Sequence, residues 1–230
     1  MITKKFITGA GFLLTFTGFS FSQSVIAPNY ALKSHETLNI TKIEITSATT
    51  VVSLSVENRI AGGTFCADKN IFILNPDGTR IKLISSSGIP VCPDTYKFKT
   101  VGEKLDFAIT FPPLKAGTEW IDIIEDCSDN CFSFYGVTLD NELNRKIDEA
   151  IVLAENKETT KAMISFINIA EATDRKNPGI EGFLYITIIK IAKETGNTVK
   201  ASEWYKKLAS SNAPRLRNYI KYLNDNGIKY

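Results

Sequence analysis

Asp122 and Glu125 form the carboxylate pair whose types and spacing best suit hydrolytic chemistry. In glycoside hydrolysis one carboxyl group donates a proton while the other attacks the sugar or activates a water molecule. Both residues belong to one predicted strand, and the sequence shows no aromatic cleft beside them. A carbohydrate-active or other hydrolytic enzyme that uses this pair is therefore an alternative hypothesis and not the leading one.

Histidine-dependent catalysis has one residue to use, because His35 is the only histidine of the chain. A Ser-His-Asp triad would have to include it, yet the chain has no Gly-x-Ser-x-Gly nucleophile elbow. The His-Glu-x-x-His, Gly-x-Gly-x-x-Gly and phosphate-loop motifs are also missing. We therefore expect His35 to be solvated, and we predict no catalytic residue, no metal site and no cofactor.

An acidic loop that contains Asp126, Asp129 and Asn130 is the candidate cation site. Carboxylate and amide oxygens in a short loop are ligands that calcium accepts. Their spacing departs from the EF-hand pattern, so a solvated loop is the favoured interpretation. A calcium-dependent adhesin is a further alternative.

The N-terminal segment has the layout of a secretory signal peptide. Lys4 and Lys5 precede an uncharged, mostly apolar run over residues 6–21, and the small residues around Ser22 suit cleavage after that position. The run is shorter than the roughly 20 residues that cross a bilayer core, and no later stretch is long enough to do so. We therefore expect residues 1–22 to be removed from a periplasmic or secreted protein with no transmembrane segment; an uncleaved anchor is the alternative.

Removal of this segment balances the charge of the chain. The full chain has 27 lysines and arginines and 25 acidic residues, and the loss of Lys4 and Lys5 leaves 25 of each sign. A formally neutral chain lacks the electrostatic footprint of a nucleic-acid-binding protein, so we expect no nucleic-acid partner.

The four cysteines of the chain are Cys66, Cys92, Cys127 and Cys131. An even number of cysteines in an exported chain favours disulfide bonds, and four cysteines allow three connectivities. Cys127 and Cys131 are close in sequence, which leaves Cys66 to pair with Cys92. The rival interpretation is a zinc ion held by all four thiolates, although Cys66 and Cys92 are too far apart to form a second zinc knuckle.

Alternating apolar residues predict short strands between residues 38 and 139. The alternation slips once near Thr41, which suggests a bulge, and it is regular over residues 50–57 and 105–111. Asn75-Pro76-Asp77-Gly78 is a strong turn signal. About seven short strands at ~10-residue spacing predict an antiparallel, immunoglobulin-like β-sandwich over residues 38–139. Residues 23–37 are expected to be an extended lead-in.

Three motifs lie at the end of this β region. They are Phe111-Pro-Pro-Leu114, Trp120-Ile-Asp-Ile-Ile-Glu125 and Phe132-Ser-Phe-Tyr-Gly-Val137. Together they resemble a β-sandwich module of exported proteins from the Bacteroidetes group. In that module a strand ending in Phe-Pro-Pro-Leu is followed by an Asp-x-Ile-Glu strand and a closing aromatic-Gly strand. The resemblance implies export and an accessory fold of unknown function, and it transfers no catalytic residue.

The apolar period changes from two to about three and a half at Asp140, which predicts a helical domain over residues 140–230. Asp140 suits the N-cap of the first of about five helices. Later helices are expected over residues 158–173, from Pro178 to Gly196, over residues 198–210, and from Pro214 to Gly227. Five helices bury little apolar surface by themselves. We therefore expect them to pack against the sandwich.

Two of the predicted helices share a pattern. Lys161-Ala162-x-x-x-Phe166-x-x-Ile169-Ala170 matches Lys200-Ala201-x-x-x-Tyr205-x-x-Leu208-Ala209 position for position. The match resembles a tetratricopeptide-type repeat, although the offset is 39 residues instead of about 34. An ordinary helical bundle is the alternative.

Basic and aromatic residues gather near the C-terminus. They are Lys206, Lys207, Arg215, Arg217, Tyr219, Lys221, Tyr222, Lys229 and Tyr230. Such a face is solvated by default, and the more specific hypothesis is contact with an acidic partner or an envelope polymer.

The leading hypothesis for the function of the chain is an exported, non-enzymatic binding or scaffold protein that mediates protein–protein or cell-envelope interactions.

Overall fold

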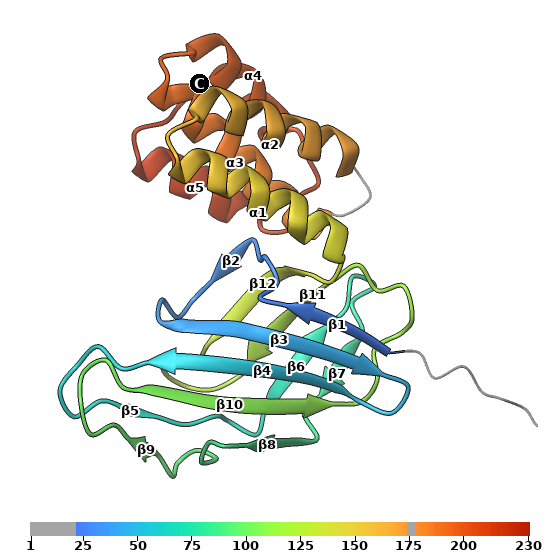
Figure 1. Ribbon diagram of the computed structural model, residues 1–230, viewed down its shortest axis with the longest axis vertical. Coiled ribbons are helices and arrows are strands. Elements are labelled where there is room, and N and C mark those ends of the chain that lie inside the picture. Colours follow the sequence, from blue (N-terminus) through green and yellow to red (C-terminus); the bar gives the residue numbers. More distant parts are fainter. Residues whose placement is uncertain (1–21, 174–177) are drawn as a thin grey trace, which may run out of the picture.

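The computed structural model describes residues 22–173 and 178–230, in which antiparallel sheets are followed by five helices (Figure 1). The class is therefore α+β, with the described helices in the C-terminal part, as predicted. The predicted signal segment lies outside the described residues, apart from its last residue, Ser22.

Two five-stranded sheets make up most of the β region. In spatial order, the first sheet contains β1 (Ser22–Ile26), β3 (Leu38–Thr46), β4 (Thr50–Glu57), β10 (Lys104–Phe111) and β8 (Ser85–Ser87). The second contains β2 (Leu32–Lys33), β12 (Ser133–Thr138), β11 (Trp120–Glu125), β6 (Ile71–Leu74) and β7 (Arg80–Lys82). β5 (Thr64–Phe65) and β9 (Tyr96–Lys97) form a separate two-stranded ribbon.

Local sequence explains the irregular points of these sheets. The register between β3 and β4 shifts between Ile40 and Lys42, which confirms the bulge predicted near Thr41. The predicted turn joins β6 to β7, where the backbone of Gly78 is left-handed with φ 84°. Glycine adopts that conformation at no steric cost, so the hairpin closes there.

Side chains from both five-stranded sheets share one apolar core. Phe107 and Ile109 of β10 belong to the same buried cluster as Ile123 of β11 and Phe134 of β12. Full burial of a large apolar side chain stabilises the folded state by roughly 1.5–3 kcal/mol. The strict alternation of β10 thus follows from one face that meets this core and one that does not.

Residues 23–37 are more ordered than the predicted lead-in. β1 pairs with β3 along its whole length, and β2 pairs with β12, so this segment contributes a strand to each five-stranded sheet. Val25 is fully buried in the shared core. Pro28 and the left-handed residue Ala27 (φ 43°) interrupt the segment, which makes its alternation too short to recognise in the sequence.

The five described helices are α1 (Asn141–Glu155), α2 (Thr159–Thr173), α3 (Pro178–Glu194), α4 (Thr198–Ala209) and α5 (Leu216–Asp225). Asp140 caps α1 as predicted, because its side chain accepts the backbone N–H groups of Glu142 and Leu143. The predicted start of α5 at Pro214 is wrong. Arg215 has a left-handed backbone (φ 62°) that no α-helix can include, so α5 begins at Leu216.

The helices rest directly on the second sheet, as expected. α1 to α4 each pack against the next helix, and α1 and α3 contact β12 (Figure 1). Two glycines permit this close approach. A Cβ atom at Gly136 of β12 would lie 2.0 Å from the carbonyl oxygen of Gly179, and one at Gly179 would lie 2.4 Å from the ring of Trp120.

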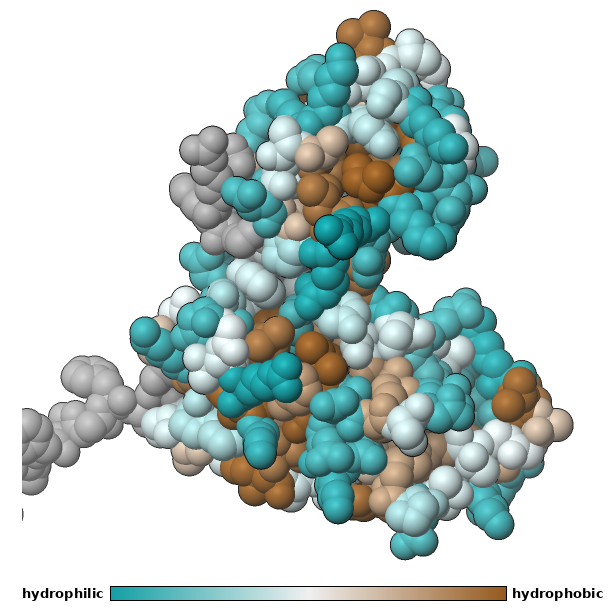
Figure 2. Space-filling view, turned by 180° about the vertical axis from the view of Figure 1, so that it is seen from behind, coloured by the Kyte–Doolittle hydropathy of each residue, from teal (hydrophilic) through white to brown (hydrophobic). Residues whose placement is uncertain are grey.

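Seen from behind, the helices and the sheets form two lobes joined at a narrower waist (Figure 2). None of the described helices combines the length and the apolar character that a membrane span requires. Polar side chains from distant segments of the chain meet at the junction between the lobes.

Candidate binding site at the junction of sheets and helices

Asp122 of β11 is a buried carboxylate at the junction between the second sheet and the helices. Its side chain is only 3% exposed. Oδ1 accepts the N–H of Gly136 at 2.8 Å, and Oδ2 accepts a hydrogen bond from Nη2 of Arg215. Both carboxylate oxygens therefore have structural partners.

Arg215 reaches Asp122 from the residue that precedes α5. Its guanidinium carbon lies 3.8 Å from the centre of the Tyr135 ring on β12, a favourable cation–π contact. The adjacent hydroxyl of Tyr219 on α5 is buried, and burial raises its pKa above the ordinary value. This junction cluster of Asp122, Tyr135, Arg215 and Tyr219 joins α5 to two strands of the second sheet.

Glu125, the other member of the predicted carboxylate pair, holds a different part of the structure. Oε1 accepts the N–H of Asp68 at 2.7 Å, and Oε2 accepts the N–H of Phe132 at 2.9 Å. Burial raises the pKa of Glu125, and the two N–H donors act in the opposite direction. The structure therefore gives Asp122 and Glu125 separate partners and does not bring them to one shared site.

His35 is partly buried, so the expectation of a solvated histidine is wrong. Its ring meets the ring of Phe65 edge-on, with the ring centres 5.4 Å apart. Nδ1 is buried and has no hydrogen-bond partner among the described residues. Burial lowers the pKa of His35, and the positive charge of Lys33 lowers it further. These surroundings favour the neutral imidazole.

The four cysteines form the two predicted disulfides. Cys66 pairs with Cys92, and Cys127 pairs with Cys131, with Cα–Cα distances of 5.3 and 5.6 Å. Both distances fit ordinary disulfide geometry. The alternative of a zinc ion held by four thiolates is therefore wrong, because the paired sulfur atoms are no longer thiolates.

The acidic loop around the second disulfide is exposed. The side-chain amide of Asn130 donates to Asp129, and Asp126 is also exposed to solvent. Within residues 22–173 and 178–230, no group of three or more histidine, cysteine or acidic side chains is placed to hold a metal ion.

A groove of about 750 Å³ lies between β1 and α1, which we call the β1–α1 groove. It is lined by Ser24, Ile26, Asn141, Asn144, Arg145, Asp148, Glu149, Val152 and Leu153. Ile26 is 65% exposed and Val152 is 51% exposed. Large apolar side chains exposed in one hollow with a polar rim are typical of a binding surface.

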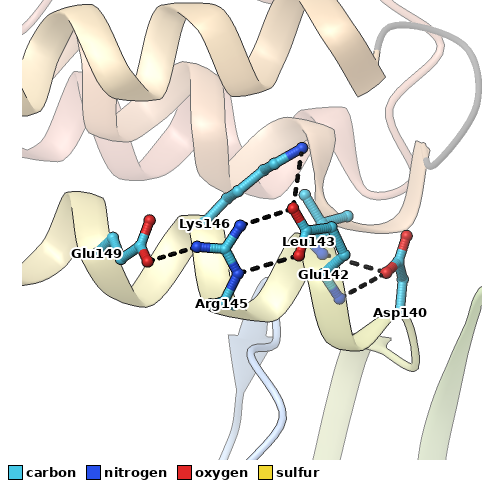
Figure 3. A network of polar contacts seen from close by, with 6 residues as sticks. All are labelled: Asp140, Glu142, Leu143, Arg145, Lys146 and Glu149. Carbon is cyan, nitrogen blue, oxygen red and sulfur yellow. Dashed lines mark hydrogen bonds and ion pairs between the residues drawn. The ribbon is translucent and has the colours of Figure 1, made fainter.

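Ion pairs along α1 fix the polar wall of this groove (Figure 3). Arg145 donates to Glu142 from Nε at 3.0 Å and from Nη2 at 2.6 Å, and its Nη1 contacts Glu149 at 2.5 Å. The neighbouring Arg145 lowers the pKa of Glu142. These side chains are exposed, so the network orients the wall rather than stabilising the fold to a large extent.

The other wall of the groove is an edge strand. Among the described strands, β1 has only β3 as a partner in its sheet, and antiparallel strands exchange hydrogen bonds at every second residue. Because the N–H of Ala27 bonds toward β3, the alternation turns the N–H and C=O groups of Ser24 and Ile26 toward the free edge. The carbonyl of Ser24 indeed accepts a hydrogen bond from the side chain of Asn141 on α1.

The basic residues near the C-terminus do not form one continuous face. Tyr219 is 1% exposed and belongs to the helical core, and Arg215 lies in the junction cluster. Lys206, Lys207 and Tyr230 instead line a second hollow beside α4.

Sequence patterns alone missed the junction cluster and both hollows. Asp122 and Arg215 are 93 positions apart in the chain, and no local period reports a contact at that separation. No protein-family model, curated protein or solved structure matches the chain, so the site is interpreted from its own geometry.

Proposed function

We propose that the chain is an exported, non-enzymatic protein that binds another polypeptide of the cell envelope through the β1–α1 groove. The observation that carries this proposal is a groove whose two walls come from the two parts of the molecule, β1 from the sheets and α1 from the helices. The hydrogen bond between Asn141 and the carbonyl of Ser24 ties these walls together. The groove is thus preorganised, which lowers the conformational entropy lost when a partner binds.

A polypeptide suits the groove better than a polymer without amide groups. An extended peptide can pair its own N–H and C=O groups with an edge strand such as β1, on which Asn141 occupies the carbonyl of Ser24 and leaves the backbone groups of Ile26 for a partner. The exposed side chains of Ile26 and Val152 then offer an apolar floor for one of its side chains. The carboxylates of Asp148 and Glu149 on the rim outnumber Arg145, so a basic residue in the partner is favoured.

We assign the β region to an immunoglobulin-like sandwich and the helices to a tetratricopeptide-like unit. The shared core of the two five-stranded sheets supports the first assignment. Ala162 and Ala201, which correspond in the repeated pattern, are both fully buried and support the second. The two copies of the pattern differ at the aromatic position. Phe166 is buried, whereas the corresponding Tyr205 is half-buried and its neighbour Trp204 is buried instead. Both assignments describe folds that often bind proteins.

The hydrolytic alternative has less support. General acid–base catalysis needs carboxyl groups that face a common substrate. In this chain each oxygen of Asp122 and of Glu125 already accepts a hydrogen bond from a separate structural partner. A substrate would have to displace those partners before either group could act.

The proposal is tested by affinity capture from the native envelope fraction with the purified protein and two matched variants. Val152→Asp places a charge in the β1–α1 groove. Ile164→Asp places the same charge on α2 at a position outside the groove that is also 51% exposed. We expect Val152→Asp to lose the protein that the native chain captures and Ile164→Asp to retain it.

Capture that both variants lose equally, or that neither loses, would contradict the assignment of the groove. Hydrolysis of an envelope polysaccharide by the native chain, abolished in Asp122→Asn with the fold intact, would support the enzyme instead. Circular dichroism of every variant distinguishes a lost contact from a lost fold.

A further inference from the structure

The second hollow has a volume of about 840 Å³ and lies beside α4, which we call the α4 groove. It is lined by Thr198, Val199, Ser202, Glu203, Lys206, Lys207, Ser210 and Tyr230. α4 lies in the upper helical lobe, away from β1 (Figure 1). A ligand here would therefore not use the surface on which the proposed function depends.

Two exposed apolar side chains border this groove. Val199 is 79% exposed, which is the largest exposure among the large apolar side chains of the described residues. Tyr230 is 47% exposed, and its ring meets that of Tyr205 edge-on with the centres 5.7 Å apart. The tyrosine is thus held at the groove by a ring contact while much of its surface stays open to a ligand.

The charge of the α4 groove is positive. Lys206 is exposed, and its side-chain ammonium has neither an ion pair nor a hydrogen bond among the described residues. Lys207 is held 4.0 Å above the ring of Trp204, and its Nζ lies 3.6 Å from Glu203 and 4.0 Å from Glu171 on α2. Glu203, the carboxylate that lines the groove, also pairs with the nearby Lys200. One lysine therefore remains uncompensated beside a second that is fixed in place.

We propose that the α4 groove binds an acidic peptide segment that carries an aromatic or aliphatic side chain. Carboxylates of the segment would pair with Lys206 and Lys207, and its apolar side chain would cover Val199 and Tyr230. The lysines alone would suit any polyanion, whereas the exposed apolar pair favours a peptide over a phosphate or sulfate polymer. The hydroxyl group of Ser202 supplies a further hydrogen-bonding group on the same wall, whereas that of Ser210 already donates to the backbone carbonyl of Lys206 and can only accept.

Fluorescence anisotropy tests this proposal with a labelled peptide in which glutamates alternate with phenylalanines. We expect saturable binding by the purified protein that weakens as salt is added. Replacement of the glutamates by glutamine, or of the phenylalanines by serine, should each weaken binding. Lys206→Glu should weaken binding about tenfold, because reversal replaces an attraction with a repulsion.

Lys221→Glu is the matched control, since Lys221 is an exposed lysine on α5 outside the groove and its replacement changes the net charge equally. Binding that both charge reversals weaken to the same extent would show non-specific attraction and overturn the proposal. Tighter binding of polyphosphate, insensitive to Val199→Asp, would overturn the peptide as ligand and identify a polyanion site. None of these outcomes depends on the β1–α1 groove, so this proposal and the proposed function fail separately.

Discussion

Arg215 and Asp122 meet at the junction of the two lobes although 93 positions separate them in the chain. The contact joins the start of α5 to β11, and the ring of Tyr135 covers one face of the guanidinium. The side chain of Arg215 is 21% exposed while that of Asp122 is 3% exposed, so the carboxylate depends on this partner far more than the arginine does. An unpaired charge at such a site would carry a large desolvation cost.

Replacement of Arg215 by alanine should destabilise the fold strongly. The variant leaves the buried Asp122 carboxylate with the N–H of Gly136 as its remaining partner, and we expect a loss of about 3–5 kcal/mol in the free energy of unfolding. Urea denaturation monitored by circular dichroism measures this loss. A loss below about 1 kcal/mol would show that solvent already screens the pair.

Two further variants separate the charge from the backbone. Asp122→Asn combined with Arg215→Ala removes both charges and should recover part of the loss, which a double-mutant cycle reports as a coupling energy. Arg215→Gly should be more stable than Arg215→Ala by about 1 kcal/mol, because the left-handed backbone at this position favours glycine. Equal stability of these two variants would mean that the backbone rearranges once the guanidinium is lost.

The glycines of the junction provide an independent prediction. Gly136→Ala places a Cβ atom 2.0 Å from the carbonyl oxygen of Gly179, in a residue whose φ is 63°. We expect a loss of about 3 kcal/mol or more, from the clash and the left-handed backbone together. Gly117→Ala is the matched control, because Gly117 also has a positive φ but open space around it, and its loss should be about 1 kcal/mol. Similar losses for both variants would show that the clash with Gly179 does not contribute to the destabilisation.

The sequence was sufficient to predict the structural features that depend on neighbouring residues of one element. The alternation in β10, the bulge near Thr41 and the cap at Asp140 each depend on a residue and its close neighbours, and all three are present. The disulfides were also predictable, because export and proximity in the chain restrict how four cysteines pair.

The sequence was insufficient where the environment comes from distant segments. His35 is partly buried because Phe65 of β5 lies against it, and nothing in the stretch around His35 indicates that neighbour. Arg215 looked like one of several surface charges after Pro214, whereas its backbone conformation and Asp122 place it in the junction. The β1–α1 groove likewise requires two elements whose relative placement no local period encodes.

The two disulfides should contribute unequally to stability. Cys66 and Cys92 are separated by 26 residues and Cys127 and Cys131 by four. Loop-closure entropy predicts a loss of about 3.5 kcal/mol when the longer loop is opened and about 2 kcal/mol for the shorter one. Paired Cys→Ser variants measured by urea denaturation give both values. A larger loss of unfolding free energy from the shorter loop would contradict the entropic account. Independently, mass spectrometry of the unreduced protein should detect no free thiol.

The single histidine makes the pH dependence of this region directly measurable. Burial and the charge of Lys33 hold the pKa of His35 below its ordinary value of 6.5, so the unfolded chain binds the proton more readily than the folded chain. The contribution of His35 to stability is therefore complete above pH 6.5 and is lost as the pH falls from 6.5 through the folded pKa. The ring proton resonances of the only histidine give that pKa by NMR without assignment ambiguity.

Lys33→Gln should raise the measured pKa of His35 toward 6.5 without reaching it, because burial is the larger cause. In His35→Gln the stability lost over this pH range should become smaller, and a measured pKa at or above 6.5 in the native chain would contradict the buried position of the ring.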